Sequence, residues 1–267
     1  MDALGDLVAR DRRSPDPAIR DDAAERTVSY RDCVGTANKV GNFLRYRGVD
    51  AGDTVAVAPE AARQPVLTLL GAALLGAPVR FAVPTADAPF DARVVVVPAS
   101  SATDGTDRGG DPDGGFDLSP GATLVAYGDP PGSPGVDHWE RNVWSENPAF
   151  PPTPVDPDGP VLLAGDDAGA GSRARALTHR EVLGRAERVA EENGLDGETA
   201  VVVRDGLADP GVVVAGVFAP LLAGGTVVFP GPETVGDLAV VSAAGAGDAT
   251  TEPVPESRVI DAASVLD

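Results

Sequence analysis

The sequence predicts an α/β protein in which mostly parallel β-sheets are flanked by helices. Short apolar runs rich in valine alternate along the chain with segments whose apolar residues recur at helical spacing. The run Val94–Val97 is apolar at every position, as expected of a strand that is covered on both faces. Serine and threonine caps and closing glycines bound the helical segments. Strands that alternate with helices in this way favour a parallel sheet.

Three helices are predicted in the first third of the chain. Met1–Arg12 is expected to be a short amphipathic helix, ended by prolines, with one apolar face of Leu4, Leu7 and Val8. Ser29 is the predicted N-cap of the next helix, with Asp32 at capping-box distance and Gly48 just past its end. Its apolar residues follow helical spacing: Tyr30, Cys33, Val34, Ala37, Val40 and Leu44. Ala61–Leu75 is apolar nearly all round, which predicts a buried helix.

Two further helices are predicted in the second half. Thr178 and Glu181 form a Thr-x-x-Glu capping box for a helix that runs to Asn193, and Gly194 follows its end. Pro210–Ala223 is expected to be a buried helix.

Strands are predicted wherever short β-branched or apolar runs lie between turn signals. They are Thr54–Ala58, Val79–Val83, Arg93–Val97, Ala122–Tyr127, Val161–Ala164, Thr199–Val203, Thr226–Phe229, Leu238–Val241 and Arg258–Ile260.

Two segments within the single domain predicted over residues 1–267 are expected to be rich in loops. Residues 100–120 contain Asp, Gly and Ser with few large apolar residues, which predicts a loop or insertion. Residues 130–160 are rich in proline, which precludes long regular elements. Trp139 and Trp144 within that segment are expected to anchor it on the core.

Charge excludes two classes of partner. The 267 residues include 29 Asp, 12 Glu, 20 Arg and a single lysine, Lys39, and the formal net charge is −20. Duplex nucleic acid and anionic membrane surfaces need Lys and Arg to neutralise phosphates, so neither is an expected partner. An acidic chain with one lysine suggests a protein adapted to concentrated salt.

Cysteine usage and hydropathy indicate a cytoplasmic protein. Cys33 is alone, so no intrachain disulfide and no cysteine-based zinc site is expected. Residues 1–13 are charged and do not have the pattern of a signal peptide. The longest apolar run, near Val66–Val79, is interrupted by glycine and proline and is too short to span a bilayer.

Five segments in order resemble the AMP-dependent synthetase/ligase family, the adenylate-forming enzymes that include acyl-CoA synthetases. These are Thr27–Asp32 (TVSYRD), Arg47–Val57 (RGVDAGDTVAV), Leu69–Phe81 (LLGAALLGAPVRF), Leu177–Leu183 (LTHREVL) and Ala219–Gly231 (APLLAGGTVVFPG). The resemblance extends from about Leu4 to Gly231. It implies the N-terminal domain of these enzymes, with parallel sheets flanked by helices. It also implies an ancestral chemistry that joins a carboxylate to ATP and then transfers the acyl group to CoA.

The phosphate-binding loop that the resemblance implies is altered. The family pattern TSGTTGxPKG falls on Gly165–Ala174, which reads GDDAGAGSRA. Asp166 and Asp167 replace a serine and a glycine, both threonines are lost, and arginine replaces the lysine. If this degenerate loop still binds a nucleotide, its contacts are Gly165, Gly169, Gly171, Ser172 and Arg173. ATP or AMP with Mg²⁺ is the cofactor left open, and no resident cofactor or metal is predicted.

Later motifs of the family are not found, which predicts a degenerate and truncated homologue. The aromatic-Gly-x-Thr-Glu and Ser/Thr-Gly-Asp motifs are missing, and Lys39, in the first long helix, is not the lid's catalytic lysine. No catalytic residue is therefore predicted, and the expected role is a non-catalytic binding or regulatory module. Two alternatives stay open. In the first, the chain is the N-terminal half of a split ligase that works with a separate C-terminal-half chain. In the second, it is an interaction protein that pairs with a full-length synthetase.

Other candidate sites have simple structural interpretations. Asp166 and Asp167 are expected to be solvated loop carboxylates rather than a metal pair. His179 is expected in the first turn of a capped helix, a position that the resemblance places near the acyl pocket. His138 is expected to be structural. The G-x-G-x-x-A string Gly169–Ala174 is separated from its preceding strand, which argues against a dinucleotide-binding turn.

The charge predicts that salt stabilises the fold. A charge of −20 on a sphere of roughly 24 Å radius has a self-energy of about 9 kcal/mol at physiological ionic strength and about 4 kcal/mol in 1 M salt. Because the unfolded chain also repels itself, the gain in stability is smaller than the difference. We expect thermal melts to show a higher melting temperature in molar KCl than in dilute buffer. An unchanged melting temperature would contradict the prediction.

Overall fold

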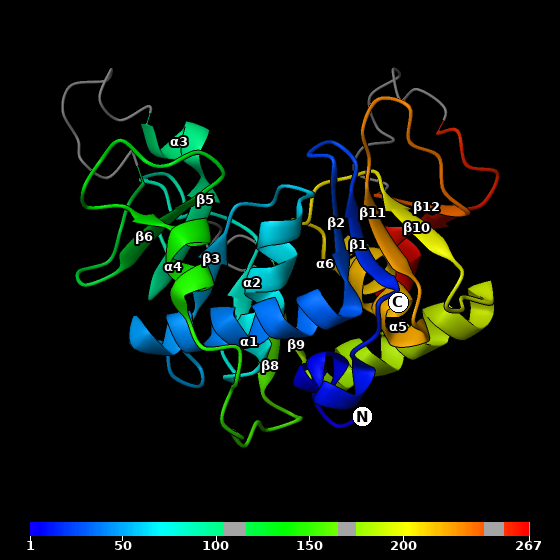
Figure 1. Cartoon of the computed structure of the whole chain (residues 1–267), viewed down its shortest axis with the longest axis horizontal. Helices are drawn as coiled ribbons and strands as arrows, with labels where there is room; N and C mark the ends of the chain where they lie inside the picture. The colour runs from blue at the N-terminus through cyan, green and yellow to red at the C-terminus, as the bar shows by residue number, and fades with distance from the viewer. Residues whose placement is uncertain (104–115, 165–174, 243–253, 267) are drawn as a thin grey trace. The chain divides into compact units, whose positions relative to one another are not determined.

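A computed structural model describes residues 1–103, 116–164, 175–242 and 254–266 (Figure 1). Two compact units divide the chain. Unit 1 comprises Met1–Val34, Pro59–Val66 and His179–Asp267, and unit 2 comprises Gly35–Ala58 and Leu67–Thr178. Each unit is built around one of the two sheets, and most strand pairs in both sheets are parallel. The predicted fold class is therefore confirmed.

The sheet of unit 1 has the strand order β13-β12-β10-β11-β1-β2. Its strands are β1 (Pro17–Asp21), β2 (Arg26–Ser29), β10 (Ala200–Val203), β11 (Thr226–Phe229), β12 (Leu238–Val241) and β13 (Val259–Asp261). All the pairs are parallel except β1 with β2, an antiparallel hairpin at one edge. The last four strands were predicted within a residue or two, whereas the β1–β2 hairpin was not predicted.

The predicted buried helix Pro210–Ala223 is continuous but changes its hydrogen-bonding pattern. It consists of α6 (Pro210–Val213), a π-helical turn (Val214–Phe218) and α7 (Ala219–Ala223). Asp209 caps its start by accepting a hydrogen bond of 2.8 Å from the Gly211 N–H. Pro220 has no N–H to continue the α-helical ladder, and a wider π turn lies immediately before it.

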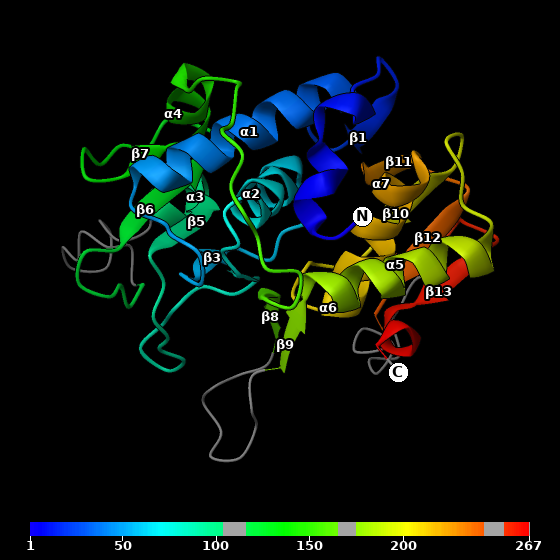
Figure 2. The same ribbon diagram turned by 90° about the horizontal axis from the view of Figure 1, so that it is seen from below.

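The other helix of unit 1, α5 (His179–Asn193), agrees with the prediction, but the N-terminal segment does not. In place of the predicted amphipathic helix, the chain forms two 3₁₀ turns, Leu4–Val8 and Arg10–Arg12. The predicted apolar residues of this segment are nevertheless buried. Arg12 donates to the carbonyls of Leu221 and Leu222, which lie in the last turn of α7. Figure 2 shows these turns beside α5 and α7.

The sheet of unit 2 has the strand order β7-β6-β5-β3-β4-β8-β9. Its strands are β3 (Val55–Val57), β4 (Val79–Arg80), β5 (Val94–Pro98), β6 (Thr123–Tyr127), β7 (Asp137–His138), β8 (Pro160–Ala164) and β9 (Arg175–Thr178). Only β8 and β9 pair in antiparallel register. Strand β4 is shorter than predicted, and β7 and β9 were not predicted. The central strand β3 is fully buried, as are Val94–Val97 of β5.

Two long helices were predicted correctly, α1 (Tyr30–Tyr46) and α2 (Arg63–Ala73). The first residues of each, up to Val34 and Val66, belong to unit 1. Ser29 caps α1: its hydroxyl accepts from the Asp32 N–H at 3.1 Å and donates to the Asp32 carboxylate at 2.8 Å. Gly48 adopts a φ of 75° after the end of α1, a backbone conformation that favours glycine.

The loop-rich segments contain more structure than predicted. Residues 100–103 belong to a short helix, α3 (Ala99–Thr103), because the apolar faces of Ala99 and Ala102 pack on the core cluster of unit 2. Helix α4 (Trp139–Ser145) lies in the proline-rich segment. Trp139 is buried, as predicted, and its indole N–H donates to the Thr68 hydroxyl at 3.1 Å. Trp144 is not a core anchor, because 66% of its surface is exposed.

In unit 2, α1 and α2 approach closely through two glycines, Gly41 and Gly71. A Cβ added at Gly71 would lie 2.5 Å from Val40 Cγ1 and 2.9 Å from the backbone nitrogen of Gly41. These distances are shorter than any normal contact, so a side chain at Gly71 would force the helix backbones apart.

We therefore expect Gly71→Ala to destabilise the protein by about 1–3 kcal/mol through overpacking. Gly35→Ala, in α1, is the matched control, because no atom lies within 4 Å of its added Cβ. The control should be neutral or stabilising by up to about 1 kcal/mol, since alanine favours a helix more than glycine does. Denaturant unfolding of both variants measures the difference, and equal stabilities would show that the helix contact is not close.

Candidate functional site

The predicted phosphate loop connects β8 and β9, the antiparallel pair at one edge of the unit 2 sheet. Ala164, the last residue of β8, pairs with Arg175, the first residue of β9. Buried Leu162 and Leu177 hold the hairpin on the core. The predicted contacts on the connection lie outside the described residues: Gly165, Gly169, Gly171, Ser172 and Arg173, together with Asp166 and Asp167.

The connectivity excludes a dinucleotide-binding turn at this place. Such a turn joins a strand directly to a helix, whose N-terminus receives the pyrophosphate. The string Gly169–Ala174 is instead followed by β9, and α5 begins only after that strand.

His179 has the structural position that was predicted for it. It is the first residue of α5, is fully buried, and accepts a hydrogen bond of 3.2 Å at Nδ1 from the Leu4 backbone N–H. The imidazole therefore joins the N-terminal segment to the start of α5. His138 is also structural, since its Nε2 lies 3.0 Å from the Gly128 carbonyl oxygen and 3.2 Å from a carboxylate oxygen of Glu140.

Burial suppresses the reactivity of two side chains near the start of α1. The Cys33 thiol is buried, which raises its pKa to about 12, so it is not a thiolate nucleophile at neutral pH. Burial also raises the pKa of the Tyr30 phenol, although Arg12 acts in the opposite direction. The Tyr30 hydroxyl donates to the Gly225 carbonyl at 2.7 Å, so its role is to tie α1 to the end of α7.

A polar cluster that the sequence analysis missed includes Arg204, at the carboxyl edge of the unit 1 sheet, where ligands bind in open α/β sheets, and Glu256, which precedes β13. Arg204 follows β10, and its guanidinium contacts both carboxylate oxygens of Glu256, at 3.2 Å from Nε and 2.5 Å from Nη2. The same Nη2 donates to the Thr234 carbonyl at 2.7 Å, and the Gly236 N–H donates to Glu256 at 3.2 Å. No spacing signal could have revealed this pair, because 52 residues separate its members.

Neighbouring carboxylates at this edge are also occupied by protein donors. Asp205 accepts from the Ser242 N–H at 2.5 Å, and Asp209 accepts from the Ser242 hydroxyl at 2.6 Å. In the part of the chain that the structure describes, no group of three or more His, Cys, Asp or Glu side chains is arranged to hold a metal ion. The carboxylates of Asp205, Asp209 and Glu256 are therefore engaged by donors of the chain itself.

Glu256 is ionised in the fold at neutral pH. Burial of its side chain opposes ionisation, but the hydrogen bonds from Arg204 and Gly236 outweigh that cost and lower its pKa. Because the pKa of Glu256 is lower in the folded chain than in the unfolded chain, its carboxylate stabilises the fold at pH values above the unfolded pKa. This contribution is lost as the pH falls through the folded pKa.

We expect Glu256→Gln to destabilise the protein by about 1–3 kcal/mol at neutral pH, because it weakens a charged hydrogen bond inside the fold. The deficit should shrink as the pH falls below the ordinary glutamate pKa of about 4.3 and through the lowered folded pKa, where the wild-type carboxylate takes up its proton. Urea unfolding of wild type and variant, at neutral pH and in acid, measures the deficit in stability. Glu198→Gln is the control, because it removes the same charge from an exposed side chain. A deficit independent of pH would contradict the assignment.

Comparisons with known proteins identify the fold. By sequence, the chain matches no protein-family model and no curated protein. By structure, it is similar to the anthranilate CoA ligase AuaEII in complex with anthranoyl-AMP, with a TM-score of 0.72 and 18% identity over 91% of this chain and 50% of the ligase. It is similar to ATP-bound MatB from Rhodopseudomonas palustris, with a TM-score of 0.67 and 17% identity over 91% and 50% of the two chains.

A third similar structure corresponds to an N-terminal domain. The N-terminal domain of FACL13 from Mycobacterium tuberculosis matches with a TM-score of 0.66 and 15% identity, over 91% of this chain and 64% of that one. The chain thus spans about half the length of the two ligases above. Among the described residues, no helix has the length and hydropathy needed to cross a bilayer. The chain has the fold of the N-terminal part of the adenylate-forming ligases.

Proposed function

We propose that this chain is a non-catalytic binding or regulatory module built on the N-terminal fold of adenylate-forming ligases. The observation that carries the proposal is the contrast between the two sheets of the fold, which are present, and the phosphate loop, whose sequence is altered. Both sheets of the fold are retained, including the β8–β9 hairpin on either side of the phosphate loop. The loop itself, residues 165–174, has lost the hydroxyl-bearing residues and the lysine of the family pattern and has gained Asp166 and Asp167.

Electrostatics argues against a triphosphate at this loop. A carboxylate about 4 Å from a phosphate charge costs about 4 kcal/mol at an effective dielectric constant of 20. Arg173 offsets part of this repulsion, but arginine does not replace a lysine and two threonines as phosphate donors. A ligand with less charge than ATP at this position is accordingly favoured.

The structural neighbours suggest which ligands to test. AuaEII is in complex with anthranoyl-AMP, and MatB has bound ATP. Acyl-adenylates and AMP carry a single phosphate, so they meet less repulsion from Asp166 and Asp167 than ATP does. We propose an AMP-like or acyl-AMP-like ligand for the module.

We expect AMP or a non-hydrolysable acyl-AMP analogue to raise the melting temperature in molar KCl by more than ATP–Mg²⁺ does. The purified chain should release no pyrophosphate from ATP in the presence of carboxylic acids and CoA. Acyl-adenylate formation by the isolated chain would overturn the proposal. Release of pyrophosphate only after a second chain is added would favour the split-ligase alternative, and a stable complex with a full-length synthetase without any ligand shift would favour the interaction alternative.

The two aspartates can be tested directly. Asp166→Ser with Asp167→Gly removes both carboxylates from the loop, and we expect it to strengthen ATP binding at least tenfold, measured by calorimetry. Asp87→Ser with Asp129→Gly is the matched control, because it removes two exposed carboxylates elsewhere in unit 2. An equal gain in both double variants would show that only the net charge matters.

A further inference from the structure

One arginine of unit 2 lies within an apolar row of the sheet. Arg80, the last residue of β4, is only 7% exposed. Residues that pair in register on adjacent strands carry their side chains on the same face of a sheet, so the pairs define a row across unit 2. From β6 to β9 its members are Leu124, Val95, Ala56, Arg80, Leu163 and Ala176. Arg80 is the one charged residue of this row.

The row is covered on one side of Arg80 and open on the other. The three members on the β6 side belong to the buried core cluster of unit 2, against which Phe90 packs. On the β9 side, Leu163 is half-buried and Ala176 is exposed. Arg80 therefore lies where the covered part of this face meets a part that is accessible to solvent.

An aromatic ring orders the side chain of Arg80. The guanidinium carbon lies 4.1 Å from the centroid of the Phe90 ring. A cation over an aromatic face is attracted by the ring, and the attraction is stronger when the two groups are removed from water. Arginine presents its N–H donors in a planar fork that matches the oxygens of a phosphate or carboxylate. The ring contact orders this fork but supplies no oxygen acceptor to it.

Arg80 lies at the edge of the unit 2 sheet where a ligand is expected. Strands β3, β4, β5, β6 and β8 pair in parallel, so their carboxyl ends share one edge, and ligands of open α/β sheets bind at such an edge. Arg80 pairs with Leu163 of β8, and the phosphate loop of the sequence begins two residues later, at Gly165. Because neighbouring strands lie about 4.8 Å apart, Arg80 lies beside the end of the strand from which that loop starts.

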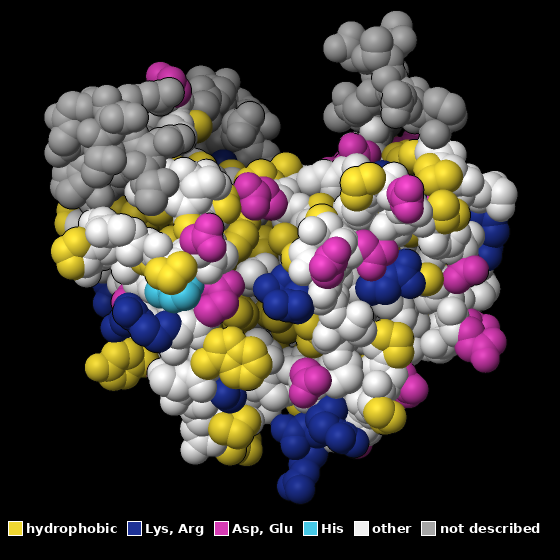
Figure 3. All heavy atoms as spheres, turned by 45° about the horizontal axis from the view of Figure 1, so that its top comes forward, with side chains coloured by type: hydrophobic (Ala, Val, Ile, Leu, Met, Phe, Trp, Pro, Cys, Tyr) yellow, Lys and Arg dark blue, Asp and Glu magenta, His cyan; other side chains and the backbone are white. Residues whose placement is uncertain are grey.

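Burial distinguishes Arg80 from cations at the surface. In Figure 3, several Lys and Arg side chains lie beside Asp or Glu side chains on the displayed face, where water and salt screen each charge. A buried cation is screened less, so it attracts a phosphate more strongly. Removing a charge from water costs free energy, and the other buried members of the row are apolar, so packing does not account for an arginine at this position.

We propose that Arg80 is a phosphate-binding residue for the AMP-like ligand. This inference rests on the proposed function and adds a contact to it: the guanidinium donates to oxygens of the ligand's phosphate group. Arg80 thereby supplies, from β4, a cation that does not belong to the altered loop. One buried fork matches one oxyanion, which suits a monophosphate better than a triphosphate.

Isothermal titration calorimetry of the full chain in molar KCl, with AMP and adenosine as ligands, tests the proposal. We expect Arg80→Met, which keeps a long side chain but removes its charge, to weaken AMP binding at least tenfold. Adenosine has no phosphate, so its affinity should be the same for variant and wild type. Arg80→Lys keeps the charge without the planar fork and should weaken AMP binding by a smaller factor.

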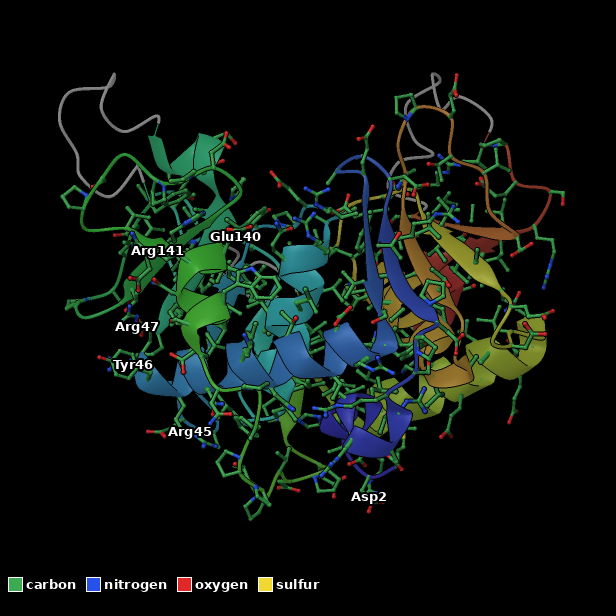
Figure 4. All side chains as sticks on the ribbon, in the orientation of Figure 1. Asp2, Arg45, Tyr46, Arg47, Glu140 and Arg141 are labelled. Atoms are coloured by element: carbon green, nitrogen blue, oxygen red, sulfur yellow. The ribbon has the colours of Figure 1, made fainter. Side chains whose placement is uncertain are left out.

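Arg45→Met is the matched control. Arg45 also belongs to unit 2, and its guanidinium carbon lies 4.5 Å from the centroid of a phenylalanine ring, that of Phe150. Figure 4 shows its side chain near the end of α1. The control removes the same charge and the same kind of ring contact from a helix rather than from the row. It should leave the affinity for AMP unchanged.

Three results would overturn the assignment of Arg80 while leaving the proposed function intact. One is an AMP affinity that Arg80→Met does not change. Another is an equal weakening of AMP and adenosine binding, which indicates a structural role. The third is a control variant that weakens AMP binding as much as Arg80→Met does. Where circular dichroism shows that Arg80→Met is unfolded, Arg80→Lys decides, and an AMP affinity equal to that of wild type overturns the assignment.

A wild-type chain that binds no AMP would instead contradict the proposed function. Inorganic phosphate, compared with KCl at equal ionic strength, then tests Arg80 by itself. A rise in melting temperature that Arg80→Met abolishes would support the phosphate contact. No rise in the wild type, or an equal rise in both proteins, would overturn it.

Discussion

Burial of short valine-rich strands on both faces is the constraint on which the rest of this structure depends. Strand β3 in unit 2 and strand β11 in unit 1 are each buried at every position. A strand with two apolar faces is stable only when other elements cover both of them, which requires the crossover helices of a parallel sheet. The apolar helices α2 and α6–α7 follow from the same requirement, since a helix packed between a sheet and other elements has no polar face.

A parallel arrangement also concentrates polar groups at the ends of the strands. In unit 1 the residues that follow β10 and β12 are Arg204, Asp205 and Ser242, and each makes hydrogen bonds with partners far away in the sequence. In related folds this edge receives ligands, whereas here the described part of the edge is occupied by ion pairs and hydrogen bonds within the chain. The ligand that we propose therefore depends on the phosphate loop rather than on this edge.

The acidic composition gives the few cations of the chain distinct roles. Arg12 contacts carbonyls near the end of α7, Arg63 pairs with the buried Asp21 at 3.2 Å, and Arg204 holds Glu256. These arginines stabilise the fold from inside, where salt screens their interactions least. Lys39 instead donates to the carbonyl of Trp144, a residue whose side chain is exposed.

Much of the fold could be predicted from the sequence because its signals are local. The cap formed by Ser29 and Asp32, the start of α5 at His179 and the strand Val94–Val97 depend on neighbouring residues, and all three are confirmed. The alteration of residues 165–174 is likewise a property of the sequence itself. Tertiary structure alone decided strand β1 and the edge strands β2, β7 and β9, whose hydrogen-bonding partners are set by packing rather than by residue pattern. Tertiary structure also decided that Trp139 is buried and Trp144 is exposed, and that Arg204 pairs with Glu256. Burial and ion pairing depend on residues that are distant in sequence, and their separation follows no periodic pattern.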